Sequence, residues 1–315
     1  MKKKVLVTGC AGFIGSNLVD RLLKEKYFVY GIDNFRTGKR RFLNESFKNK
    51  NFNFVKENLL NKNKLIKIFN KNIDIIFHFA ANADVRYGYL RPLNDLNYNI
   101  IVTSNVLEAM RINKIKKIIF CSTGSVYGET DEIPTPENAN FPIQTSMYGA
   151  SKLACEGLIQ AYSEAYNIKS YIFRFVSILG PRYTHGHIVD FYNKLKKNKK
   201  KLKVLGNGLQ KKSYLHVYDC ISAILKVINC KKTKIVNTFN LGTEEFISVN
   251  QSIKIITKYL KLKPRLEYTG GKSGWIGDVS FILLDIKKIK KLGWKPSFSI
   301  KDSILSTLNY LTKKK

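Results

Sequence analysis

The feature that most constrains the fold is the alternation of short apolar runs with helical patterns over the first 175 residues. Residues 3–9 form an apolar run that ends in Thr and Gly, and the next segment carries Ile14, Leu18 and Leu22 at helical spacing. Further strands are predicted at residues 28–33, 52–59, 73–80, 117–123 and 169–175, and further helices at residues 96–112 and 146–167. Continuous apolar strands that alternate with helices are typical of a parallel sheet covered on both faces. The sequence therefore predicts an α/β protein with a doubly wound parallel sheet.

The pattern becomes less regular after residue 176, where short strands and helices mix with loops such as LGPRYTHGH and YTGGKSGWIGD. This change predicts a Rossmann-type domain at residues 1–175 and a smaller α+β lobe at residues 176–315, with some exchange of chain between the two. No segment rich in proline and glycine separates them, so we expect no flexible linker.

Three glycines join the first predicted strand to the first predicted helix in the sequence VTGCAGFIG. Gly9 permits the tight turn, Gly12 lets backbone N–H groups approach a diphosphate, and Gly15 allows helix and strand to pack closely. The helix N-terminus favours the negative charge. Asp33, at the end of the second strand, is placed to accept hydrogen bonds from an adenosine ribose and would repel a 2′-phosphate. The pattern predicts a site for NAD rather than NADP.

The sequence MYGASK places Tyr148 and Lys152 four residues apart on a predicted helix, so both side chains share one face. A lysine ammonium beside a phenol stabilises the phenolate, so we expect a lowered pKa for Tyr148. Such a tyrosine can take a hydroxyl proton while a hydride leaves for a nicotinamide. A lone pair of this kind is usually a solvated helix face, but here it follows the dinucleotide turn and the segment STGSVYG.

The chain of 315 residues carries a formal net charge of +32. This charge allows two explanations, which are binding to nucleic acid or a membrane surface, and a compositional bias towards lysine. The lysines are spread along the chain without a repeated pattern of aromatic residues, so we favour the bias and expect neither specific nucleic-acid binding nor membrane binding. The charge would still attract an anionic small molecule at long range.

The five cysteines are scattered and form no C-x-x-C pair, which argues against a disulfide framework or a zinc site and favours a cytoplasmic protein. His185 and His187 have no third residue at metal-site spacing, so we predict no metal. No stretch approaches the roughly 18 apolar residues of a membrane span.

These motifs together resemble the extended short-chain dehydrogenase/reductase family, in particular its NAD-dependent nucleotide-sugar epimerases and dehydratases. The resemblance covers nearly the whole chain and rests on TGCAGFIGSNL, GIDNFRTGKR, HFAANADV, NIIVTSNVLEA, STGSVYGE, YGASK, FRFVSILGPR, GNGLQKKSYLHVYD and LGWKP. It implies that Tyr148 is the active-site base, that Lys152 supports it and binds the nicotinamide ribose, and that Thr123 hydrogen-bonds the 4-hydroxyl of the sugar.

The resemblance also implies two sets of binding residues. The residues expected at NAD are Gly9, Gly12, Phe13, Ile14, Asp33, Asn34, Asn58, Leu59, Phe79, Ala80, Ala81, Asn99, Ser122, Tyr148 and Lys152. The residues expected at the nucleotide sugar are Thr123, Gly124, Ser125, Ser177, Arg182, Lys212 and Trp275. Relatives also pair through the helices at residues 96–112 and 147–166, which implies a homodimer.

Two positions distinguish the members of the family. The dehydratases resemble Thr-Asp-Glu where this chain has Thr123, Gly124 and Ser125, and the decarboxylases carry an acid at the place of Ser125. The absence of both acids disfavours 4,6-dehydration and decarboxylation and favours a nucleotide-sugar 4-epimerase. A 4-dehydrogenase that releases a 4-keto hexose or heptose, and a non-catalytic NAD-binding protein, remain alternatives.

Four positions depart from the family pattern. Ser177 stands for an asparagine, Lys212 and Trp275 each stand for an arginine, and Asn58 stands for an acidic residue that often contacts adenine. Lys212 can still neutralise a phosphate, although without the two-pronged contact of arginine. The sequence therefore leaves open whether the nucleotide is UDP, GDP or dTDP.

Overall fold

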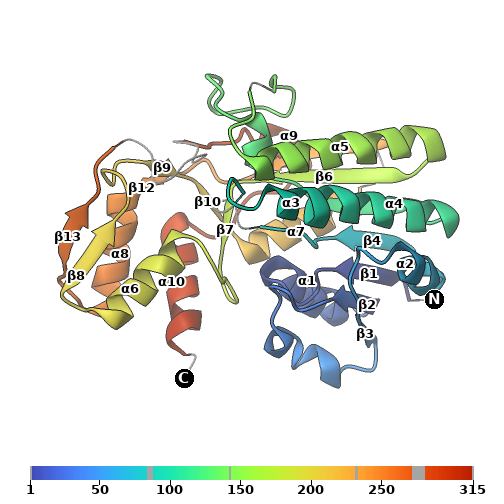
Figure 1. The fold of residues 1–315 in the computed structure, drawn as a ribbon, viewed down its shortest axis with the longest axis horizontal. Coiled ribbons are helices and arrows are strands. Elements are labelled where there is room, and N and C mark those ends of the chain that lie inside the picture. The colour runs from blue at the N-terminus through green and yellow to red at the C-terminus, as the bar shows by residue number, and fades with distance from the viewer. Residues whose placement is uncertain (1, 84–87, 142, 231–232, 272–280, 314–315) are drawn as a thin grey trace. The chain divides into compact units, whose positions relative to one another are not determined.

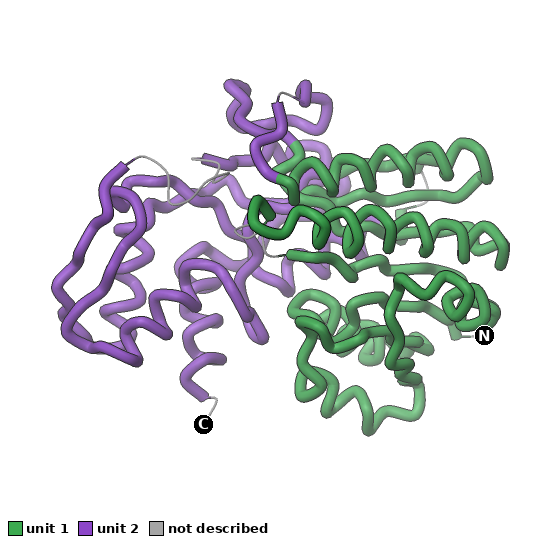
Figure 2. The backbone as a smooth tube through the Cα atoms, in the orientation of Figure 1, with its two compact units in different colours: residues 1–126, 147–174, 228–239 green, residues 127–146, 175–227, 240–315 purple. Residues whose placement is uncertain are grey.

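The computed structural model describes residues 2–83, 88–141, 143–230, 233–271 and 281–313 (Figure 1). The chain divides into two compact units, each made of three segments (Figure 2). Unit 1 contains Met1–Val126, Met147–Arg174 and Ile228–Phe239, and unit 2 contains Tyr127–Ser146, Phe175–Val227 and Asn240–Lys315. The assignment of NAD to a first domain and of the nucleotide sugar to a second stays a prediction.

Unit 1 is built on a seven-stranded sheet with the order β11-β6-β5-β4-β1-β2-β3. The strands are β1 (Lys4–Thr8), β2 (Phe28–Asp33), β3 (Phe52–Lys56), β4 (Ile75–His78), β5 (Lys117–Cys121), β6 (Lys169–Phe175) and β11 (Val236–Leu241). The pairings from β6 to β3 are all parallel. The order reverses direction at β1, which is the topology of a doubly wound sheet, so the predicted fold class is confirmed.

Helices cover this sheet because its central strands, such as β1 and β4, are apolar and buried along most of their length. The helices of unit 1 are α1 (Phe13–Lys24), α2 (Lys62–Phe69), α3 (Pro92–Asp95), α4 (Val102–Ile112) and α5 (Met147–Tyr166), with a π-helical segment at Leu96–Ile101 between α3 and α4. One core cluster joins a face of the sheet to α2, α4 and α5 through side chains such as Ile118, Leu107 and Ile159. The helix predicted at residues 96–112 therefore begins as a π-helical segment and continues as α4.

Unit 2 mixes short strands with helices, as the sequence predicts. Its strands β7 (Ser177–Leu179) and β10 (Tyr214–His216) pair in parallel, as do β8 (Lys201–Val204) and β13 (Arg265–Tyr268), whereas β9 (Lys211–Lys212) and β12 (Ile247–Ser248) are antiparallel. Its helices are α6 (His187–Lys197), α7 (Val217–Ile228), α8 (Val249–Leu260), α9 (Lys287–Lys290) and α10 (Ile300–Thr312). Ser248 and Ser299 begin α8 and α10 with capping boxes, which satisfy backbone N–H groups at the helix ends. Within the described ranges no helix has the length and apolarity needed to cross a membrane.

A buried histidine makes the stability of the protein depend on pH. His78, at the end of β4, is 1% exposed, and burial together with the charge of Lys152 lowers its pKa from the usual 6.5 to about 3. The folded state therefore binds fewer protons than the unfolded state between pH 6.5 and pH 3, so stability falls as the pH falls through that range. At pH 5 this one ring costs about 2 kcal/mol of unfolding free energy.

We predict that replacing His78 with Gln reduces the fall in unfolding free energy between pH 7.5 and pH 5 by about 2 kcal/mol, because glutamine has no proton to gain. Urea unfolding of both proteins at the two pH values measures the difference. The exposed His185→Gln variant is the control and should fall as the wild type does. Equal falls for wild type and His78→Gln would mean that the ring titrates normally in the folded protein.

Candidate active site

The turn after β1 requires glycine at two of its three predicted positions. Gly9 has a φ of +67°, and a Cβ placed on it would lie 2.7 Å from the backbone of Ala80. A Cβ on Gly15 would collide with the carbonyl oxygen of Gly9. Gly12 begins α1 without any side-chain cap, and Phe13 and Ile14 form the first helical turn. An uncapped helix N-terminus behind a bare backbone turn fits the diphosphate of a dinucleotide.

The carboxylate of Asp33 ends β2 beside this turn. It accepts hydrogen bonds from the backbone N–H groups of Ala11 at 2.9 Å and Phe35 at 2.7 Å, which fix its orientation. Burial raises the pKa of Asp33, and the two backbone hydrogen bonds oppose that change. A Cβ on Gly38 would lie 2.8 Å from one carboxylate oxygen, so this glycine keeps space open there. We had not identified Gly38 from the sequence, although it lies only five residues after Asp33.

A buried hydrogen-bond chain holds the segment after β4 against the glycine turn. His78 Nδ1 lies 2.8 Å from Thr8 Oγ1, and that oxygen accepts hydrogen bonds from the N–H groups of Phe79 at 3.1 Å and Ala80 at 3.2 Å. Ala81 follows directly and is half-buried. The predicted cofactor residues on β1 and β4 are therefore brought together at one edge of the sheet.

Two further predicted cofactor positions lie in the loops after β2 and β3. Asn34 accepts a hydrogen bond from the N–H of Arg36 at 2.9 Å, and Asn58 accepts one from the N–H of Leu60 at 3.1 Å. The side chain of Asn105 on α4 donates to the carbonyl oxygen of Leu59 at 3.0 Å. These bonds fix the backbone of both loops near the carboxyl ends of their strands.

The π-helical segment positions Asn99, which is 2% exposed. Its side chain donates to Ser151 Oγ on α5 at 2.8 Å and accepts from the N–H of Asn82 at 2.8 Å. Asp95 accepts from the Asn82 side chain at 2.9 Å. An extra residue in one helical turn redirects side chains and recurs at functional sites, and here it ties the segment after β4 to α5.

The three predicted catalytic residues lie together in unit 1. Thr123 follows β5, and its hydroxyl is hydrogen-bonded to Tyr148 in the first turn of α5. Lys152, one turn further along, is 3% exposed, and its Nζ lies 4.1 Å from the centroid of the Phe120 ring. Thr123 thus supplies a hydroxyl donor, Tyr148 a phenol and Lys152 an ammonium group, which suits proton transfer from one substrate hydroxyl.

The predicted lowering of the tyrosine pKa is wrong for the protein alone. Burial raises the pKa of Tyr148 well above its usual value, the charges of Cys121 and Asp95 add to the rise, and the hydrogen bond from Thr123 opposes it. Burial also lowers the pKa of Lys152. Desolvation disfavours the charged form of both side chains, so Tyr148 is a neutral phenol in the free protein.

The residues after Thr123 carry no acid. Gly124 and Ser125 enter a 3-10 turn at Gly124–Tyr127, where the Ser125 N–H donates to Thr123 Oγ1 at 3.1 Å and the two hydroxyl oxygens lie 3.2 Å apart. Gly124 is buried and Ser125 is half-buried. The segment forms a turn, and the turn orients the Thr123 hydroxyl, while its contact with a sugar stays a prediction.

A buried ion pair behind the catalytic residues was not identified from the sequence. Arg174 on β6 donates to Glu156 on α5 at 2.7 Å, and the two side chains are 4% and 1% exposed. Ser122, which we had expected at NAD, donates its hydroxyl to the same carboxylate. Glu156 lies one helical turn after Lys152, and that spacing was the signal that could have revealed it.

Four predicted substrate residues belong to the other part of the chain. Ser177 begins β7 and is exposed, Arg182 has a φ of +70°, and Lys212 ends β9. The charge of Lys212 and burial together lower the pKa of His187 to about 3. Trp275 lies outside the described residues. Among the described residues no three His, Cys, Asp or Glu side chains gather as a metal site would require.

Comparison with known proteins gives consistent matches over the full length. Residues 5–242 match the family described as "NAD dependent epimerase/dehydratase family". A putative UDP-glucose 4-epimerase of Methanocaldococcus jannaschii is 35% identical over 98% of both chains. A solved UDP-glucose 4-epimerase of Thermotoga maritima with UDP-glucose has a TM-score of 0.88 at 31% identity, covering 98% of this chain and 99% of that one. A UDP-glucuronic acid 4-epimerase of Bacillus cereus with NAD and UDP-glucuronic acid has a TM-score of 0.90 at 31% identity, with the same coverage.

We predict that Glu156→Gln lowers the unfolding free energy by about 3–5 kcal/mol, because it leaves the Arg174 charge buried without a counter-charge. Urea unfolding of the purified variant measures this change. The double variant Glu156→Leu/Arg174→Met should recover much of the loss, since it removes both charges.

The matched control is Glu108→Gln, which breaks the more exposed pair between Glu108 and Arg111. We expect it to cost less than about 1 kcal/mol. A Glu156→Gln variant as stable as this control would contradict the view that the buried pair holds β6 to α5.

Proposed function

Because the chain belongs to the NAD dependent epimerase/dehydratase family, we propose that it interconverts UDP-linked hexoses that differ in configuration at C4. The family, the epimerase class and the dependence on NAD that the sequence predicted are confirmed. The identity of the nucleotide and the roles of individual residues belong to the proposal.

The observation that carries the proposal is the set formed by Thr123 and Tyr148 without an acid at Gly124 or Ser125. Epimerisation at C4 needs one group to remove and return a single proton. Water elimination needs an additional acid to protonate the departing hydroxyl, and the two positions that would supply it carry glycine and serine. The set is thus complete for epimerisation and incomplete for dehydration.

The residues around the glycine turn fit NAD. In the proposal, the first turn of α1 binds the diphosphate, Asp33 binds the adenosine ribose, and Lys152 binds the nicotinamide ribose. Phe79, Ala80 and Ala81 line the cofactor, with Asn34, Asn58 and Leu59 at its adenine end. When bound, NAD supplies a hydride acceptor and a positive nicotinamide ring.

The chemical step then follows from the catalytic residues. Thr123 hydrogen-bonds the 4-hydroxyl group and holds it at Tyr148, which takes its proton as the C4 hydride departs. The 4-keto sugar turns so that its other face receives the hydride, and Tyr148 returns the proton to O4. Since the protein alone keeps Tyr148 neutral, the positive charges of Lys152 and the bound cofactor must lower its pKa for the first proton transfer.

We assign the nucleotide to UDP because the relatives with a printed substrate act on UDP-sugars. In this chain Lys212 and Arg182 supply positive charge for the diphosphate. Ser177 is small and exposed, which suits a sugar-side contact that tolerates more than one hexose.

The test is incubation of the purified protein with UDP-glucose, UDP-N-acetylglucosamine and UDP-glucuronate, with NMR detection of the C4 epimer. GDP-mannose serves as the control nucleotide sugar. We expect epimerisation of at least one UDP-sugar and none of GDP-mannose. A released ketone with stoichiometric NADH would instead support the 4-dehydrogenase, and conversion of GDP-mannose alone would overturn the assignment of the nucleotide.

On the substrate that responds, Tyr148→Phe should lower kcat by about 10²–10⁴-fold, because it removes the group that transfers the proton. Thr123→Val should lower kcat/KM by about tenfold to a hundredfold, mainly through kcat, since it removes one hydrogen bond to a group that becomes charged. Ser125→Ala is the matched control with a smaller effect. An unchanged rate for Thr123→Val would mean that the segment after β5 is only a structural turn and does not take part in catalysis.

We also infer a homodimer that pairs through α4 and α5. Leu96 and Ile101 before α4 are 42% and 40% exposed, and the outer face of α5 exposes the small residues Ala154, Gly157 and Ala161. An apolar stripe beside small residues suits close packing of two copies of the same surface.

Light scattering should give twice the monomer mass, and Ala154→Arg should give a monomer. Asn53→Arg, on the exposed edge strand β3, is the control and should leave the dimer intact.

A further inference from the structure

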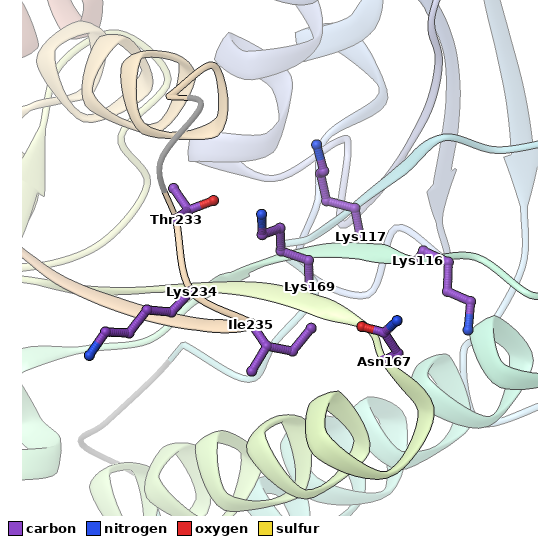
Figure 3. A pocket seen from close by; sticks show the side chains of 7 residues that line it. All are labelled: Lys116, Lys117, Asn167, Lys169, Thr233, Lys234 and Ile235. Atoms are coloured by element: carbon purple, nitrogen blue, oxygen red, sulfur yellow. The ribbon is translucent and has the colours of Figure 1, made fainter.

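A cavity of ≈ 430 Å³ opens at the amino-terminal edge of the sheet in unit 1 (Figure 3). Its lining consists of Lys116, Lys117, Asn167, Lys169, Thr233, Lys234 and Ile235. These residues come from the starts of β5 and β6 and from the segment before β11, which are neighbours in the sheet. Four of the seven are lysines, and the lining contains no carboxylate.

Two of these lysines face each other across the sheet. Lys117 and Lys169 are directly opposed in the parallel register of β5 and β6, so their side chains leave the same face. Figure 3 shows both side chains on one side of the strands, with Thr233 on that side as well, while Lys116 points to the other side. The ammonium group of Lys116 already has a hydrogen-bond partner, because its Nζ donates to the carbonyl oxygen of Tyr166 at 2.7 Å. Like charges placed opposite each other destabilise a sheet.

Burial and the charges of neighbouring cations act in the same direction on the pKa of Lys117. Burial lowers the pKa of Lys117, and the charges of Lys3 and Lys169 lower it further. Asp74 acts in the opposite direction, but one of its oxygens accepts a hydrogen bond from the N–H of Lys4 at 2.7 Å. Lys117 and Lys169 are both half-buried, Lys3 is exposed, and Asp74 offsets part of the effect of the two neighbouring lysines on Lys117.

Lys117 and Lys169 differ from the single exposed lysines because they are half-buried and directly opposed, and a minority of the lysines do form ion pairs. Lys194, Lys201 and Lys290 each reach a carboxylate oxygen at 2.8–2.9 Å. Within the described part of the chain, neither Lys117 nor Lys169 forms such a pair. A compositional bias towards lysine explains exposed single lysines better than it explains a directly opposed, half-buried pair at a cavity whose lining contains no carboxylate.

We propose that this cavity is a binding site for a compact polyphosphate, either inorganic or carried by a nucleotide. Phosphate groups bring several negative oxygens that two separated ammonium groups can share, and lysine binds phosphate as a point charge. Thr233 adds a hydroxyl on the same side, whose oxygen lies 3.2 Å from Tyr171 Oη, whereas the exposed Lys234 points to the other side of the strands (Figure 3). Binding would relieve the repulsion between Lys117 and Lys169.

This site is separate from the catalytic residues. Lys117 begins β5, whereas Thr123 lies beyond its other end, so roughly 13 Å of strand intervenes at about 3.3 Å per residue. The polyphosphate would therefore bind without displacing NAD or the nucleotide sugar.

The test is calorimetric titration of the protein with sodium tripolyphosphate at about 0.15 M salt, where exposed charges are screened beyond about 8 Å. NAD and UDP are present in excess so that catalytic phosphate sites are filled. We expect Lys117→Gln/Lys169→Gln to weaken binding by about tenfold or more, since two charged contacts are lost. The control Lys196→Gln/Lys197→Gln removes the same charge from the exposed end of α6 and should leave the affinity within about twofold, because screening limits its reach.

Equal weakening in the two double variants would show general attraction to a chain of net charge +32 and would overturn the site, as would no binding by the wild type. ATP in place of tripolyphosphate distinguishes a nucleotide from an inorganic ligand, and binding of either at this site supports the proposal. Chemical acetylation of surface lysines, followed by mass spectrometry, tests the same site in the wild-type protein. Tripolyphosphate should protect Lys117 and Lys169 from acetylation but not Lys196, and equal protection of all three would also overturn the site.

Discussion

The parallel direction of the strands is the constraint on which the site depends. Because neighbouring strands run the same way, their carboxyl ends meet at one edge of the sheet, and four of these strands end there with a residue of the candidate site. Gly9 follows β1, Asp33 ends β2, His78 ends β4, and Ser122 and Thr123 follow β5. The opposite edge necessarily collects the residues that begin the strands, which is why Lys117 and Lys169 face each other there.

The sheet and the residues at its carboxyl edge could be predicted from local sequence patterns, because such patterns depend on neighbouring residues alone. The glycine spacing could be interpreted without a structure, since Gly9 needs a positive φ and Gly15 leaves no room for a Cβ. The pairing of Thr123 with Tyr148 followed from two short motifs, and the structure brings them into hydrogen-bonding contact. The chemical assignment to epimerisation rested on two missing acids, an observation that the sequence alone makes.

Properties set by distant parts of the chain could not be predicted in the same way. The expected lowering of the Tyr148 pKa considered Lys152 and omitted burial, which depends on the whole packed unit and proved the larger effect. Similarly, nothing in the pattern of residues 96–112 indicates the π-helical segment or the contacts that Asn99 within it makes with Asn82 and Ser151. The ion pair of Glu156 and Arg174 joins two elements whose proximity only the fold reveals.

The buried charges on α5 show how the unit supports reactive groups. Lys152 and Glu156 lie one turn apart on a face that is almost fully buried, an arrangement that costs free energy for each charge separately. Arg174 compensates Glu156, and that carboxylate in turn accepts the hydroxyl of Ser122, the residue directly before Thr123. The stabilised pair therefore fixes the strand end beside the Thr123 hydroxyl, while Lys152 is left with an aromatic ring and no carboxylate of its own among the ion pairs described. Burial lowers the pKa of this ammonium group, so an anion beside it would stabilise its charged form, and the phenolate of Tyr148 is the anion that the proposed reaction creates.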